Sequence, residues 1–169
     1  SEPNMDEDTR KEFSAIIQKN TEELMQLVND VLDLSRLEAN MMKFQIQEYD
    51  AVALCNDAIY MARMRNEETI EIYFDTHIET QPITTDTGRL IQALVSTLTY
   101  PQKNTTHREI TFTLTRDDSG KQICFRISNS PLADPEFNSQ EVSIRHDINR
   151  LLLQHFGGSY NITADEQER

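Results

Sequence analysis

The chain has 169 residues and a formal net charge of −13. This length suits one ordinary domain, or a small domain with a helical appendage. The acidic balance excludes nucleic acid and anionic membrane surfaces as partners, because their phosphate groups would be repelled. Since no apolar run of about 18 residues and no signal peptide is visible, we expect a cytoplasmic segment without membrane contact. Cys55 and Cys124 lack a CxxC spacing, which indicates buried thiols in a reducing compartment.

The first predicted element is a helix from about Asp8 to Ala39. Its core-type residues alternate in steps of four and three, which is heptad spacing. They are Phe13, Ile17, Asn20, Leu24, Leu27, Val31 and Leu34. Further apolar residues widen this stripe and favour a four-helix bundle over a two-stranded seam. Asn40 suits the left-handed conformation that ends a helix. Packing on its own domain and packing in a bundle with another segment or chain both stay open, and we favour the bundle.

From Met41 onward the apolar spacing changes from helical to alternating. The predicted strands cover residues 42–46, 70–74, 110–114, 123–127 and 160–163, with a short strand at Ile83. Asp50 and Asp86 are good caps for two helices, the second of which ends before Pro101. A last helix covers 143–156 and is closed by Gly157 and Gly158. This order predicts an α+β fold, a two-layer sandwich in which one mixed sheet carries helices on one face.

Residues 24–39, LMQLVNDVLDLSRLEA, resemble the second helix of the dimerisation and phosphotransfer hairpin of bacterial sensor histidine kinases. The segments FQIQEYD and TTDTGRLIQALVSTL and the final GG resemble the ATPase domain that follows this helix in the family. The resemblance implies two parts, a hairpin helix over 1–41 and a degenerate ATPase domain over 42–169. It also implies that the chain is the cytoplasmic part of a membrane-anchored receptor. In the family, a helix that would precede Ser1 carries the phosphoacceptor histidine. The implied partners are a homodimer or helical-bundle partner through residues 9–38 and a response-regulator receiver domain.

The family's magnesium site is altered in this chain. In the family, the helix after the RLxQ pattern carries an asparagine that helps hold Mg²⁺. Alignment on this pattern puts Tyr100 at that position and Ser96 at the preceding asparagine. A phenol is bulky and neutral at pH 7, so it is a poor magnesium ligand. Lys103 matches the family's pattern, although a lone lysine beside a helix end is more often surface charge.

The family's glycine-rich boxes are also replaced. Asn129 stands where an aspartate would accept a hydrogen bond from adenine, and Pro131 and Ala133 stand at expected glycines. Proline removes a backbone donor, and alanine adds a Cβ where the chain must approach the ligand. Glu141 puts negative charge where phosphates would lie. We therefore expect neither ATP nor Mg²⁺ as a cofactor, and we predict no catalytic residue and no metal site.

Two functions stay open from the sequence. The first is a signal-transduction module of a two-component phosphorelay, a pseudokinase that acts as a dimerisation and interaction scaffold. The second is an active ATP-dependent protein-histidine kinase core with divergent nucleotide boxes. The loss of three motifs together favours the first. The pair His146-Asp147 superficially resembles a phosphoacceptor box, but it aligns with the glycine-rich helix start.

Overall fold

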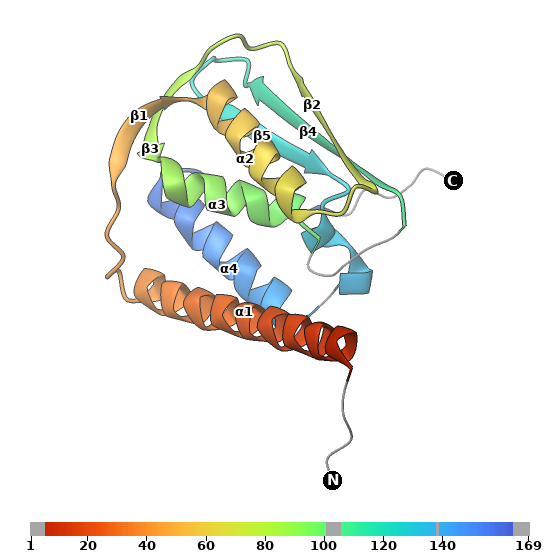
Figure 1. The fold of residues 1–169 in the computed structure, drawn as a ribbon. Coiled ribbons are helices and arrows are strands. Elements are labelled where there is room, and N and C mark those ends of the chain that lie inside the picture. The colour runs from red at the N-terminus through yellow and green to blue at the C-terminus, as the bar shows by residue number, and fades with distance from the viewer. Residues whose placement is uncertain (1–5, 101–105, 138, 164–169) are drawn as a thin grey trace.

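A computed structural model describes residues 6–100, 106–137 and 139–163. The long helix α1 (Glu7–Glu38) runs along one side of the molecule (Figure 1). Asp6 begins it, because its carboxylate accepts a hydrogen bond from the Thr9 N–H at 2.8 Å. Asn40 ends it in the left-handed conformation, with a φ of 55°. The predicted helix and its stop signal are confirmed.

The remaining elements form the two-layer sandwich that the sequence predicts. Strand β4 (Arg108–Arg116) lies between β2 (Ile70–Thr76), which is parallel to it, and β5 (Ile123–Ser128), which is antiparallel. Helices α2 (Ala51–Arg65) and α3 (Thr87–Leu98) cover one face of this sheet (Figure 1). The buried side chains between these layers form the main core, and the fully buried Phe112 is among its largest members. Burial of such apolar side chains is the main stabilising contribution to the fold.

A second, smaller sheet pairs β1 (Ile46–Asp50) with β3 (Pro82–Asp86) in antiparallel register. Asp50 accepts hydrogen bonds from the N–H groups of Val52 and Ala53 at the start of α2, and from the Gln81 N–H at 2.7 Å. The Gln81 bond is the main reason why the pKa of Asp50 lies below its usual range. Asp86 caps α3 by accepting from the Arg89 N–H at 3.1 Å, and it also accepts from the Gln45 N–H at 2.9 Å. The caps predicted from the sequence thus also tie the two strands together.

Helix α4 (Gln140–His155) lies between α1 and α3 (Figure 1). Two short 3-10 helices precede it, η1 (Pro131–Ala133) and η2 (Pro135–Phe137). A second apolar cluster joins α4 to the end of α1 and to α3, and its buried members are Leu37, Met42, Ala93, Ile148 and Leu152. The C-terminal end of α1 is therefore part of the folded domain.

Several boundaries differ from the sequence predictions. The first strand begins at Ile46 rather than Met42, because Met42 is buried in the cluster with α1 and α4. The last helix begins at Gln140, since Ser139 caps it through the Val142 N–H. Helix α3 ends at Leu98, and Pro101 lies outside the described residues.

Three other expectations are wrong. The five described strands form two sheets rather than one. Residues 160–163 form no strand, and Tyr160 instead directs its hydroxyl at a side chain of α4. Cys124 is exposed, because it lies on the outward side of the alternating strand β5. Cys55 is buried as predicted, and this burial raises the pKa of its thiol to about 12.

Candidate functional site

The aligned nucleotide positions lie around the end of α3, the η1 segment and α4. Tyr100 follows α3 and is buried, with its ring edge-on to Phe137 at 5.4 Å between centroids. Its backbone N–H donates to Asn66 Oδ1 at 2.9 Å. Burial raises the pKa of the Tyr100 phenol, which stays neutral. Tyr100 therefore acts as a packing residue, and its phenol presents no charged oxygen to a cation.

The segment at the aligned glycine box packs against α3. Ser130 donates its hydroxyl proton to the Thr97 carbonyl at 2.7 Å, and Pro131 is fully buried. Asn129 has a φ of 62°, and its side-chain amide donates to the Glu109 carbonyl at 3.4 Å. The Asn129 amide is thus turned toward its own sheet. On the α4 side, Asn149 is completely buried and donates to Ser96 Oγ at 3.2 Å.

His146 connects α4 to both neighbouring segments. Its Nε2 lies 3.0 Å from the Leu132 carbonyl oxygen, and its Nδ1 lies 2.7 Å from the Tyr160 hydroxyl. A carbonyl can only accept, so Nε2 carries the proton and donates to it, while the Tyr160 hydroxyl donates to Nδ1. Burial lowers the pKa of His146, which favours this neutral form. We call Leu132, His146 and Tyr160 the η1–α4 seam.

A cavity of about 360 Å³ remains beside the seam. Its walls come from η1 and the residues after it, the first turns of α4, and Ile162. No arginine or lysine is among the described residues that line it, and Asp134 contributes a carboxylate. Arg108 of β4 is paired with Asp134 at 3.8 Å and with Glu136 at 3.2 Å. This environment is unfavourable for a triphosphate.

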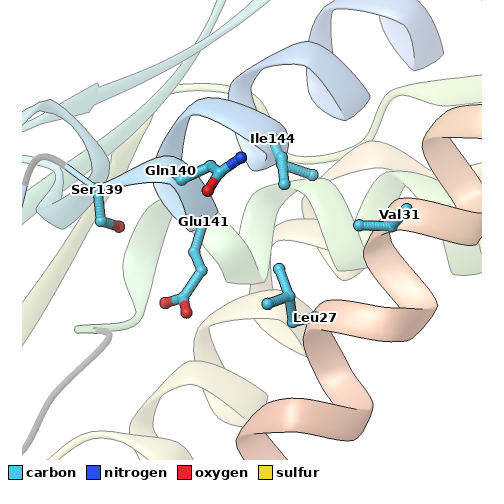
Figure 2. A pocket seen from close by; sticks show the side chains of 6 residues that line it. All are labelled: Leu27, Val31, Ser139, Gln140, Glu141 and Ile144. Carbon is cyan, nitrogen blue, oxygen red and sulfur yellow. The ribbon is translucent and has the colours of Figure 1, made fainter.

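A second cavity, of about 240 Å³, lies between α1 and the first turns of α4. Figure 2 shows Leu27 and Val31 of α1 facing Ile144 and the polar residues at the start of α4. Glu141 lies in this groove rather than beside the η1–α4 seam (Figure 2). The groove therefore combines an apolar helix face with a carboxylate.

Helix α1 is divided into an attached and an exposed part. Asp30 pairs with Arg145 of α4 at 2.5 Å, and Asp33 pairs with Arg89 of α3 at 3.1 Å. In the exposed part, Phe13, Ile17 and Leu24 are 51%, 65% and 60% accessible to solvent. The heptad stripe thus packs on its own domain near Leu34 and Leu37 and is open to solvent closer to the N-terminus.

Comparisons with known proteins find similar sequences, although no protein-family model matches the chain. It is 26% identical over 119 residues to hybrid signal transduction histidine kinase A of Dictyostelium discoideum, which covers 70% of this chain and 6% of that relative. It is 36% identical over 72 residues to the uncharacterized sensor-like histidine kinase ycf26 of Pyropia yezoensis, covering 42% of this chain and 11% of the relative. Over these stretches the chain is similar to sensor histidine kinases.

Solved histidine kinases share the fold of this chain. Acinetobacter baumannii histidine kinase AdeS matches with a TM-score of 0.60 at 16% identity, over 86% of this chain and 74% of that one. Full-length ShkA, solved in complex with AMPPNP, matches with a TM-score of 0.61 at 20% identity, over 86% of this chain and 34% of that one. The chain spans only a small part of the curated relatives that it matches.

The candidate nucleotide positions that the structure describes do not form one pocket. Tyr100, Pro131 and Ser96 take part in packing or hydrogen bonds around α3, and Ala133 lines the cavity beside the seam. Asn129 lies at the sheet, and Glu141 lies in the groove with α1. Lys103 lies outside the described residues.

Sequence reasoning missed the contacts that close this region of the histidine kinase fold. His146, Tyr160 and Leu132 come from three separate segments, and no local pattern brings them together. The same holds for the pairs of Asp30 with Arg145 and of Asp33 with Arg89. The only available signal was the replacement of the aligned glycines by larger residues. None of the described helices is both long and apolar enough to cross a bilayer.

Proposed function

We propose that this chain is a signalling and interaction module of a two-component sensor histidine kinase whose ATPase-like sandwich does not bind Mg·ATP. The observation that carries the proposal is the η1–α4 seam. His146 contacts the Leu132 carbonyl and the Tyr160 hydroxyl at hydrogen-bond distance, so these contacts bridge η1, α4 and the segment at Tyr160 beside the cavity. A nucleotide would have to break these contacts before binding.

The electrostatics of the same region support the proposal. A triphosphate needs cationic side chains or free backbone N–H groups, as at a glycine-rich helix start. The described lining of the cavity beside the seam offers Asp134 and His146, and burial favours the neutral form of His146. The whole chain carries a net charge of −13, which adds long-range repulsion. Binding of Mg·ATP therefore lacks a favourable electrostatic field at this cavity.

The interaction role rests on the exposed part of α1. This part carries a row of solvent-exposed apolar side chains, Phe13, Ile16, Ile17, Leu24, Met25 and Val28. Contiguous exposed apolar surface of this kind marks an interaction site. We propose a homodimer or a helical-bundle partner through residues 9–38, and a response-regulator receiver domain as the partner that the assembled bundle docks.

Isothermal titration calorimetry with Mg·ATP and with Mg·ADP tests the proposal. We expect no binding heat at millimolar nucleotide, because the seam must open and no cation compensates the phosphates. ShkA, which was solved with AMPPNP, is the positive control under the same conditions. Saturable binding at micromolar nucleotide would contradict the proposal.

The second candidate function is an active protein-histidine kinase core with divergent nucleotide boxes. The names of the curated relatives and the AMPPNP complex of ShkA favour it. It predicts micromolar nucleotide binding and transfer of the γ-phosphoryl group of ATP to a histidine of a separately supplied first hairpin helix. Incubation with radiolabelled ATP and that helix would detect the transfer, and we expect none.

A further inference from the structure

Three potential metal ligands meet on the outer side of the main sheet. Parallel pairing of β2 with β4 places Glu71 directly opposite Glu109, and His107 immediately precedes β4. His107 Nε2 lies 3.4 Å from Glu109 Oε1 and 3.8 Å from Glu71 Oε2. One ligand atom from each of the three side chains lies within 4.8 Å of the other two. We propose that Glu71, His107 and Glu109 form a binding site for a divalent transition-metal ion of the zinc type.

The distances suit the coordination shell of such an ion. Zinc binds histidine nitrogen at about 2.0–2.1 Å and carboxylate oxygen at about 2.0–2.2 Å, in tetrahedral geometry. Two ligand atoms at these distances are roughly 3.4 Å apart. The two histidine–carboxylate separations are 3.4 Å and 3.8 Å, so small side-chain rotations bring all three groups onto one ion.

The electrostatics of the cluster also favour a cation. Carboxylates on directly opposed residues of neighbouring strands repel each other. Within the described part of the chain, no lysine or arginine forms an ion pair with Glu71 or Glu109, and His107 is their shared partner. A divalent ion removes this repulsion, and the net charge of −13 attracts cations to the surface.

Tyr73 supplies an outer contact for the site. Its hydroxyl donates to Glu71 Oε2 at 2.5 Å, and this hydrogen bond is the main reason why the pKa of Tyr73 lies above its usual value. Contacts of this kind orient metal-binding carboxylates and tune the affinity for the ion. The donor set of one imidazole and two carboxylates suits zinc, with water completing the coordination.

The bound ion would join β2 to the start of β4. Because Glu71 belongs to β2 and Glu109 to β4, coordination cross-links the two parallel strands. Ligands that bind only the folded state raise its stability. This site does not depend on whether the sandwich binds a nucleotide, and nothing in the relatives' names assigns it.

Calorimetric titration of the chelator-treated full chain with Zn²⁺ tests the site. We expect saturable binding of one ion per chain. His107→Ala and the double variant Glu71→Gln/Glu109→Gln should each weaken binding by at least about 10–100-fold, since loss of outer-shell partners alone costs that much. His77→Ala and Cys124→Ser are matched controls, because each removes an exposed candidate ligand outside the cluster. We expect both controls to bind zinc like the wild type.

A thermal-unfolding measurement separates binding from misfolding. Without zinc, His107→Ala should have the Tm of the wild type, because the side chain is 58% exposed. Zinc should raise the Tm of the wild type and not that of His107→Ala. No saturable binding, unchanged affinity in His107→Ala, or loss of binding in either control variant would overturn the proposal.

Discussion

The ion pair between Asp30 and Arg145 holds α1 on the sandwich, and its removal gives a sharp test of the fold. The two groups lie 2.5 Å apart, with 13% and 16% of their side chains exposed. Asp30 Oδ1 also accepts a hydrogen bond from Gln26 Nε2 at 2.9 Å. Arg145→Ala would leave this carboxylate largely shielded from water and without its cation.

The expected cost lies between two limits. Exposed ion pairs contribute about 0.2–1 kcal/mol, whereas removal of one member of a buried pair costs about 3–5 kcal/mol. Because the pair is mostly but not fully buried and Asp30 keeps the bond from Gln26, we expect Arg145→Ala to lower the free energy of unfolding by about 2 kcal/mol. That is roughly a 30-fold change in the unfolding equilibrium constant.

Urea unfolding followed by circular dichroism measures this change. Arg150→Ala is the matched control, because Arg150 lies on the same helix and forms an ion pair with Asp147 at 3.1 Å that is about half exposed, at 46% and 50%. The control should change stability by no more than about 0.5 kcal/mol. A double-mutant cycle with Asp30→Asn then isolates the pair energy. Equal stability of the two arginine variants would refute the argument from burial.

Three further predictions concern packing, pH and assembly. Leu37→Ala should lower the free energy of unfolding by about 2–5 kcal/mol in urea titrations, since Leu37 is 2% exposed in the cluster with α4. The pKa of His146 is lower in the folded state than the unfolded value near 6.5. The neutral side chain therefore stabilises the fold fully above that unfolded value, and this stabilisation is lost as the pH falls toward the folded pKa. His146→Gln should make the urea midpoint less sensitive to acid. Leu24→Asp, at a 60% exposed position, should leave the unfolding of the sandwich unchanged and shift sedimentation toward monomer, and a sedimentation profile like that of the wild type would contradict the proposed bundle.

Local signals in the sequence predicted most of the fold. The caps Asp50 and Asp86 and the stop at Asn40 depend on residues within a few positions of one another, and the structure has all three. Between β4 and β5 the chain turns at 117–120, where the Gly120 N–H donates to the Asp117 carbonyl at 2.9 Å. Alternation also marked the strands, but it carries no information on which strands pair. The division into two sheets therefore could not be predicted.

The candidate site was less predictable because long-range contacts determine it. The substitution of Tyr100 indicated an altered pocket, yet its packing against Phe137 depends on where η2 lies. From the sequence, His146 is a polar residue near the start of a helix. Its two hydrogen-bond partners, the Leu132 carbonyl and the Tyr160 hydroxyl, come from distant segments that only the fold brings together. Residues 160–163 were predicted to form a strand. In the structure they form none, and the Tyr160 hydroxyl instead contacts His146 of α4.

We propose that contacts between the protein's own residues block the aligned nucleotide position between η1 and α4. Amide NMR spectra recorded with increasing Mg·AMPPNP test it most directly, because they report on each segment separately. We expect the resonances of Leu132, His146 and Tyr160 to stay unchanged up to millimolar analogue. Saturable shifts at these residues, together with those of Ala133 in the adjoining cavity, would contradict it.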